Sequence, residues 1–137
     1  MMPPNIDKTV ATTIHNEEKK MQQIQIPPLE EGEKYVGAIG DKNGDFYHVI
    51  LLPGDNEDAT WLKQKEWAKS IGGDLPTRVE QAMLWANHRD QFKRDWYWSN
   101  EEESSGCAWY QYFNNGYQYF TGKGHELRAR AVRRLPI

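Results

Sequence analysis

The sequence predicts an α+β domain in which two helices pack against an antiparallel sheet. One observation is the order of the local patterns: β-prone runs, then two helical segments, then further β-prone runs. A second is the length of 137 residues, which fits one domain and leaves little room for a second core. A third is the set of six tryptophans, which supply large apolar surfaces to an otherwise hydrophilic chain.

Charge and cysteine content limit the classes of function. The formal net charge of −3 is small, so it indicates neither nucleic-acid attraction nor mimicry of a polyanion. The single cysteine, Cys107, cannot form an internal disulfide. No signal peptide and no long apolar run is recognisable, so we expect a protein that folds in a reducing cytoplasm and does not enter a membrane.

The first 25 residues differ from the rest of the chain. They are polar, show neither helical nor strand periodicity, and lead into Ile26-Pro27-Pro28, whose prolines restrict the backbone to extended conformations. We expect a flexible arm over residues 1–25 and one folded domain over residues 26–137. A leader without a specific role is the simpler interpretation, and an arm that binds a partner or a second copy is the alternative.

A hairpin is predicted at the start of the domain. Two β-prone runs, residues 35–39 and 46–52, flank the turn sequence Asp41-Lys-Asn-Gly-Asp45. Asn-Gly tolerates the positive φ that tight hairpin turns require. The alternating oxygen-bearing residues also resemble the start of a calcium loop, but the distal bidentate glutamate is missing, so a plain turn is favoured.

The first predicted helix covers residues 60–70. Asp58 or Thr60 would cap it, and Gly72-Gly73 would end it, because glycine adopts the left-handed conformation found at helix ends. Its expected apolar face is Trp61, Ala68 and Ile71.

The second predicted helix begins at Thr77 and ends near His88. Thr77 and Glu80 form a capping box, the strongest local signal in the sequence. The residues expected to face the sheet at helical spacing are Val79, Ala82, Met83 and Ala86, together with Trp85.

The remainder of the chain is predicted to be β. Aromatic runs at residues 96–99, 108–113 and 117–120 are typical of strands, and the Asn114-Asn115-Gly116 turn makes the last two a hairpin. A final strand is predicted over residues 129–133, with arginines that face outward or pair with carboxylates.

These segments resemble a known family. Gly73-Asp-Leu-Pro-Thr-Arg-Val-Glu80, Trp96-Tyr-Trp-Ser99, Ala108-Trp-Tyr-Gln-Tyr-Phe113 and Arg128-Ala-Arg-Ala-Val-Arg-Arg134 resemble bacterial and prophage domains related to the C-terminal domain of a collagen-like adhesin. The resemblance covers roughly residues 60–135. It implies a C-type-lectin-like fold, with antiparallel sheets and two packed helices, similar to formylglycine-generating enzymes and to variable phage receptor-binding proteins. It also implies a phage or prophage origin, but it leaves the chemistry open.

The residues that the known chemistries of that superfamily require are missing from this sequence. Copper binding of the formylglycine-generating type would need two cysteines, and calcium-dependent sugar binding would need triplets such as Glu-Pro-Asn and Trp-Asn-Asp. We therefore expect no catalytic residues, no cofactor and no metal. The four histidines, His15, His48, His88 and His125, follow no recognisable catalytic spacing, which leaves open an enzyme whose site assembles from distant residues.

Aromatic residues near the C-terminus are the candidate binding surface. Tyrosine and tryptophan offer large, rigid contact areas with a polar edge. We expect Trp96, Trp98 and Trp109 in the core, with exposed binding residues among the tyrosines. An acidic run beside them is either a solvated turn or a complement to a basic partner. The predicted partner-binding residues are Glu101, Glu102, Glu103, Tyr110, Tyr112, Asn114, Asn115, Tyr117 and Tyr119.

The function expected from these observations is non-enzymatic protein binding. The leading hypothesis is a phage or prophage protein in the host cytosol that binds and inhibits a host protein complex, such as a CRISPR effector. The alternative is an adhesion module that binds a receptor or a glycan. Scattered arginines with carboxylates between them disfavour nucleic acid as the partner. Formation of a homo-oligomer is left open.

Overall fold

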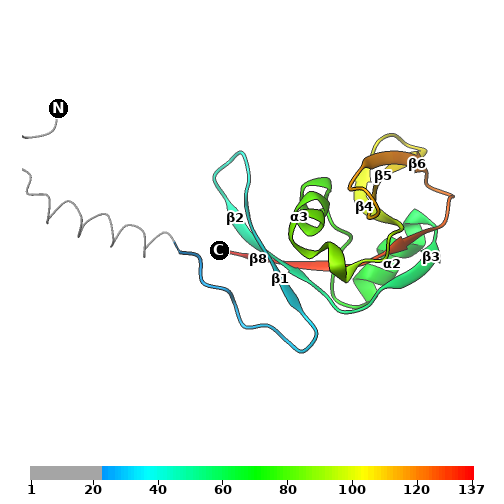
Figure 1. The fold of residues 1–137 in the computed structure, drawn as a ribbon. Coiled ribbons are helices and arrows are strands. Elements are labelled where there is room, and N and C mark those ends of the chain that lie inside the picture. The colour runs from blue at the N-terminus through cyan, green and yellow to red at the C-terminus, as the bar shows by residue number, and fades with distance from the viewer. Residues whose placement is uncertain (1–22) are drawn as a thin grey trace, which may run out of the picture.

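The computed structural model describes residues 23–137 and has a mixed α+β architecture with two helices and two sheets (Figure 1). The expected arm over residues 1–25 lies outside the described residues except for its last three, which are exposed and have no regular structure. The elements are β1 (Lys34–Gly40), β2 (Phe46–Leu51), β3 (Asn56–Ala59), α2 (Trp61–Ser70), α3 (Arg78–His88), a 3₁₀ turn (Arg89–Gln91), β4 (Trp96–Glu102), β5 (Cys107–Tyr112), β6 (Gln118–Gly122), β7 (Leu127–Ala129) and β8 (Val132–Pro136).

The strands form two separate sheets. One has three strands in the order β1-β2-β8, and the other has five in the order β3-β7-β4-β5-β6. Neighbouring strands are antiparallel except for β4 and β7. Helix α3 lies between the two sheets and contacts strands of both (Figure 1). Strand β3 is absent from the sequence-based prediction because its Asn-Glu-Asp-Ala sequence lacks β-prone residues.

The first hairpin is confirmed. The Asp41 carboxylate accepts hydrogen bonds from the backbone amides of Asn43 and Asp45, at 2.8 and 3.0 Å. Gly44 adopts a φ of 84°, which a residue with a side chain rarely takes. The Asp41 carboxylate therefore stabilises a hairpin turn, as the plain-turn interpretation predicted.

The prediction of one final strand over residues 129–133 is wrong. The chain leaves the five-stranded sheet after Ala129 and enters the three-stranded sheet at Val132. Between them, buried Arg130 donates hydrogen bonds to the carbonyls of Gln91 (2.6 Å) and Leu52 (2.7 Å). These long-range bonds fix the crossing, and no local pattern in the sequence reveals them.

The caps predicted for α2 are confirmed, whereas its predicted face is partly wrong. Thr60 caps the helix through a hydrogen bond from the amide of Lys63, and Trp61 and Ala68 are buried as expected. Ile71 is instead 40% exposed. Gln64 is wholly buried, because its side-chain amide donates to the carbonyls of Glu57 on β3 and Leu127 on β7 and accepts from Asn56 on β3.

The capping box of α3 is confirmed, but the helix faces the core with different residues. Val79 is 59% exposed, and Ala82 and Ala86 are also exposed. The buried positions are Glu80, Gln81 and Leu84. Two of these are polar: Glu80 accepts hydrogen bonds from Tyr47 and Arg134 of the three-stranded sheet, and the Gln81 side-chain amide donates to the Tyr97 carbonyl of β4. A search for apolar residues at helical spacing therefore selects the wrong face.

Two clusters of buried side chains form the core. One joins α2 to the five-stranded sheet through Trp61 and Trp98. The other joins α3 to both sheets through Leu84 of the helix, Val49 of the three-stranded sheet and Tyr97 of the five-stranded sheet. Over residues 23–137, no helix is both long and apolar enough to cross a bilayer.

Candidate functional site

Aromatic side chains gather on one face of β4, β5 and β6. Residues paired across antiparallel strands share a face. The pairs on this face include Trp96 with Tyr112, and Tyr110 with Tyr119. The next residue on the same face before β6 is Tyr117. We call these five residues the aromatic surface.

The rings of the aromatic surface contact one another. Trp96 stacks on Tyr110 with ring centroids 4.9 Å apart, and its edge meets Tyr112 at 5.9 Å. Tyr119 lies 6.4 Å from Tyr110 and 5.9 Å from Tyr117. Aromatic contacts at these separations restrict side-chain rotation. The surface is therefore preformed, with little conformational entropy left to lose when a partner binds.

Part of this face is covered and part is open. Near the middle of the sheet, Trp98 and Ala108 pack against α2 and are wholly buried. Elsewhere on the same face, Trp96 is 40% exposed, Tyr119 53% and Tyr117 58%. The exposed rings thus lie on the same face as buried core residues.

The opposite face of the same strands carries a second, smaller aromatic group. Trp109 meets Phe120 edge to face at 5.2 Å, and the guanidinium of Arg78 lies 3.5 Å above the Trp109 ring. Phe120 is 49% exposed. Because Arg78 begins α3, this contact ties the end of the sheet to the helix.

The predicted binding residues fall into two groups that lie apart. The tyrosines lie along β5 and β6, and Asn114 and Asn115 lie exposed in the turn after β5. The glutamates lie at the other end of β5, around the turn between β4 and β5. One surface containing all nine residues, as the sequence suggested, therefore does not form.

The three glutamates have different environments. Glu101 is half-buried and accepts a hydrogen bond from the backbone amide of Arg78, 2.6 Å away. Glu102 is exposed and pairs with Lys123 at 3.3 Å. Glu103 is exposed in the turn. Glu101 thus serves the N-terminus of α3, and only the other two carboxylates face solvent.

Two assignments to core and surface need correction. Tyr110 belongs to the aromatic surface but is only 8% exposed, because Trp96 stacks on it, so the expectation that it is an exposed binding residue is wrong. Trp96 was expected in the core and is instead 40% exposed. Trp98 is buried as expected, and Trp109 is partly buried. Strand alternation places Trp96 and Trp98 on one face but does not reveal how far a helix covers it.

The turn beside the aromatic surface has a fixed geometry. The Asn115 side chain accepts a hydrogen bond from the Tyr117 amide at 3.0 Å, and the Gly116 amide donates to the Tyr112 carbonyl at 2.8 Å. Gly116 has a φ of 82°, and a β-carbon there would lie 2.5 Å from the Trp85 indole nitrogen. A residue with a side chain would therefore disturb both the turn and the adjoining tyrosines.

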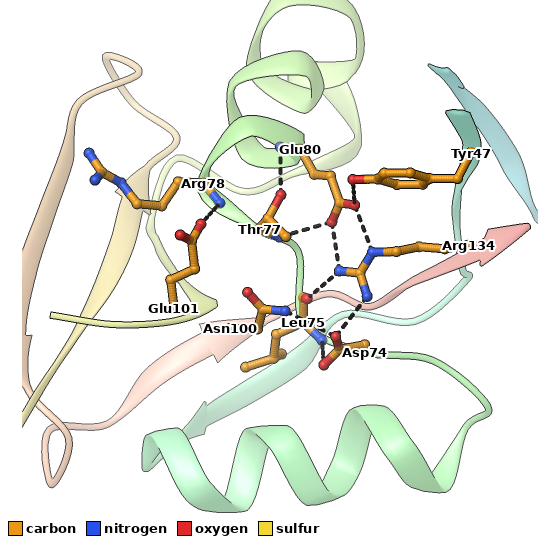
Figure 2. A network of polar contacts seen from close by, with 9 residues as sticks. All are labelled: Tyr47, Asp74, Leu75, Thr77, Arg78, Glu80, Asn100, Glu101 and Arg134. Carbon is orange, nitrogen blue, oxygen red and sulfur yellow. Dashed lines mark hydrogen bonds and ion pairs between the residues drawn. The ribbon is translucent and has the colours of Figure 1, made fainter. Parts of the chain in front are cut away.

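A buried polar network lies on the other side of α3 (Figure 2). Arg134 from β8 donates two hydrogen bonds to Glu80, each 2.7 Å long, and one of 2.7 Å to Asp74. The Tyr47 hydroxyl donates to Glu80 at 3.0 Å, and the Thr77 amide does so at 2.8 Å. Glu80 is wholly buried, and both of its oxygens accept hydrogen bonds. The network therefore joins α3 to β2 and β8, and it leaves Glu80 no free oxygen for proton transfer.

The pKa values in the network follow from burial and pairing. Burial, followed by the Glu80 carboxylate, raises the pKa of Tyr47 to about 12. Burial alone would raise the pKa of Asp74, but hydrogen bonds from Arg134 and Asn100 outweigh it and hold the pKa below its ordinary value. Both groups thus keep at neutral pH the protonation state that their hydrogen bonds need.

The histidines and carboxylates of the described chain do not converge. The ring of His48 bonds to the Tyr35 hydroxyl at 2.8 Å, and that of His125 to the Thr121 hydroxyl at 2.7 Å. Within residues 23–137, no three His, Cys, Asp or Glu side chains are grouped as metal ligands would be. His15 lies outside the described residues. The candidate functional site is therefore the aromatic surface.

No protein-family model matches this sequence, and no curated protein matches it either.

Proposed function

We propose that this protein is a non-enzymatic binding module that recognises another protein through its aromatic surface. The observation that carries the proposal is the exposure of Trp96, Tyr117 and Tyr119, which are 40%, 58% and 53% exposed on one preformed face. Tryptophan and tyrosine dominate the energetic centres of protein interfaces. An exposed aromatic cluster lowers the solubility of a protein, and such clusters commonly mark the site where a partner binds.

We further propose a C-type-lectin-like fold, as the sequence resemblance implies. Supporting this are the order of strands, two helices and strands, the largely antiparallel sheets and the packing of both helices against them. The partner we propose is a host protein complex that this protein inhibits, in keeping with the phage or prophage origin implied by the same resemblance. CRISPR effectors are one class of such complexes.

A capture experiment tests the proposal. Tagged wild-type protein and the variant Tyr117→Ala/Tyr119→Ala are used as bait in bacterial lysate. Any captured complex is then purified and titrated calorimetrically against both proteins. The control is Leu62→Ala, because Leu62 is 63% exposed on α2, away from the aromatic surface. We expect binding by wild type and the control, and at least tenfold weaker binding by the double variant. Equal binding by all three would refute a role for the aromatic surface.

A receptor- or glycan-binding adhesion module is the second candidate function. Asn114 and Asn115 are exposed in the turn that connects Tyr112 to Tyr117, so this end of the sheet offers both amides for hydrogen bonding and rings for stacking, as a sugar ring requires. A glycan array distinguishes the candidates: specific retention of one oligosaccharide by wild type, lost in the double tyrosine variant, would favour this function over protein binding.

A further inference from the structure

The four sheet edges formed by residues 23–137 are not equally protected. An exposed edge strand presents unpaired backbone groups, and proteins block such edges with charges, prolines or bulges. Strand β3 carries exposed Glu57 and Asp58. Strand β8 ends in Arg134-Leu-Pro136, and β1 contains a bulge between Tyr35 and Gly37. Three of the four edges thus carry a blocking device.

Strand β6 is the exception. It is the last strand of the five-stranded sheet (Figure 1), and its sequence Gln118-Tyr-Phe-Thr-Gly122 contains no charge and no proline. Its pairing with β5 runs without a register shift. Tyr119 and Phe120 are each about half exposed, on opposite faces of the strand. This edge is therefore apolar on both faces and open to pairing.

The hydrogen-bond register shows which backbone groups of β6 are free. The Tyr112 amide donates to the Tyr117 carbonyl at 2.8 Å, and the Lys123 amide donates to the Gly106 carbonyl at 2.9 Å. Hydrogen-bonded pairs alternate along an antiparallel ladder. The backbone groups of Gln118, Phe120 and Gly122 therefore point away from β5, and no backbone partner within residues 23–137 meets those of Gln118 and Phe120.

We propose that β6 pairs with β6 of a second copy of this chain, in antiparallel orientation about a two-fold axis at Phe120. In this register Phe120 lies opposite its own counterpart, and Gln118 lies opposite Gly122. All three residues present outward-facing amides and carbonyls, so they form hydrogen-bonded pairs. The Gly122 carbonyl also accepts the His125 amide at 3.0 Å, and its second lone pair is free.

Charge and side-chain pairing favour a second copy as the occupant. Tyr119 lies opposite Thr121 of the other copy, which is a favourable cross-strand pair. The two cations beside β6 already have partners within their own copy: Lys123 pairs with Glu102, and Arg78 donates to the Gln118 side chain and lies over the Trp109 ring. The two-fold axis is perpendicular to the sheet, so both aromatic surfaces lie on the same side of a continuous ten-stranded sheet. The inference does not rest on what the aromatic surface binds.

Light scattering coupled to gel filtration tests the dimer. The full chain is measured from micromolar to millimolar concentration in reducing buffer, which excludes a disulfide between Cys107 residues. We expect wild type to approach twice the monomer mass of 16.0 kDa. Phe120→Lys places two cations directly opposite each other and should remain monomeric. Leu62→Lys, an identical charge change on an exposed residue of α2, should dimerise like wild type.

Hydrogen exchange of the wild-type protein gives a second readout that needs no variant. The Phe120 amide should exchange more slowly as concentration rises, whereas the Tyr119 amide, already bonded to β5, should not change. A monomeric mass at every concentration would overturn the proposal and leave the edge to a strand of another protein. A dimer that persists in Phe120→Lys, with rapid exchange at the wild-type Phe120 amide, would also overturn it.

Discussion

In the buried polar network a carboxylate, Glu80, is wholly covered, whereas on the aromatic surface a tryptophan, Trp96, is 40% exposed. Both reverse the usual distribution of side chains. The carboxylate is tolerated inside because four donors saturate it. The tryptophan packs against the rings of Tyr110 and Tyr112, and part of it remains exposed to water. The first region accounts for how the elements are held together, and the second is where a partner gains most by binding.

The comparison predicts that loss of Arg134 has the largest effect on stability. Arg134→Ala leaves Glu80 buried without its cation, which should lower the free energy of unfolding by about 3–5 kcal/mol. Urea denaturation followed by circular dichroism measures this change. Glu102→Gln is the control, because Glu102 forms an exposed ion pair and its loss should cost about 0–1 kcal/mol. Equal effects of the two variants would show that the network is not a structural centre.

The aromatic surface should show the reverse behaviour. Trp96→Ala should weaken partner binding by about 2 kcal/mol, a loss of roughly thirtyfold, because it removes the one tryptophan of the aromatic surface. Its stability cost should be smaller, since Trp96 loses only its contacts with Tyr110 and Tyr112. Calorimetric titration and urea denaturation of the same variant measure both effects. A variant that unfolds readily but binds normally would contradict the account.

A smaller effect is expected from the tyrosine of the network. Tyr47→Phe removes one hydrogen bond to Glu80 but leaves both bonds from Arg134 in place. A hydrogen bond to a charged group contributes about 1.5–3 kcal/mol, and the remaining donors should keep the loss near the lower figure. Urea denaturation at neutral pH measures it. No change would mean that Arg134 alone satisfies the carboxylate.

The dependence of stability on pH should be the smallest effect. The pKa of Asp74 is below its ordinary value in the folded protein. A depressed carboxyl pKa gives stability that is present above the unfolded pKa and is lost as pH falls through the folded pKa. The loss should therefore appear below about pH 4. Asp74→Asn should reduce the difference in unfolding free energy between neutral and acidic solution, and an unchanged difference would assign the loss to other carboxylates.

The sequence predicted those features that neighbouring residues determine. The Asn-Gly hairpin turns and the Thr77-Glu80 capping box depend on local dihedral angles and local hydrogen bonds, and each is present as predicted. The three aromatic runs were also correctly predicted to be strands. These features need no knowledge of tertiary contacts.

The errors arose where distant segments decide the outcome. The inner face of α3 is polar because Arg134, more than fifty residues away, pairs with Glu80. The strand over residues 129–133 divides because Arg130 bonds to Gln91 and Leu52. Trp96 and Trp98 lie on the same face of β4, yet Trp96 is 40% exposed and Trp98 is wholly buried. The sequence thus identified the aromatic region of the candidate site, while tertiary packing decides which of its residues are exposed.

The most direct test of the account is the affinity of a captured and purified partner for wild type and for Tyr117→Ala/Tyr119→Ala, measured with unfolding curves of the same samples. The account predicts an affinity at least tenfold weaker for the variant, with an unfolding free energy within about 0.5 kcal/mol of wild type. An unchanged affinity in a fully folded variant would contradict the claim that this protein binds its partner through the aromatic surface.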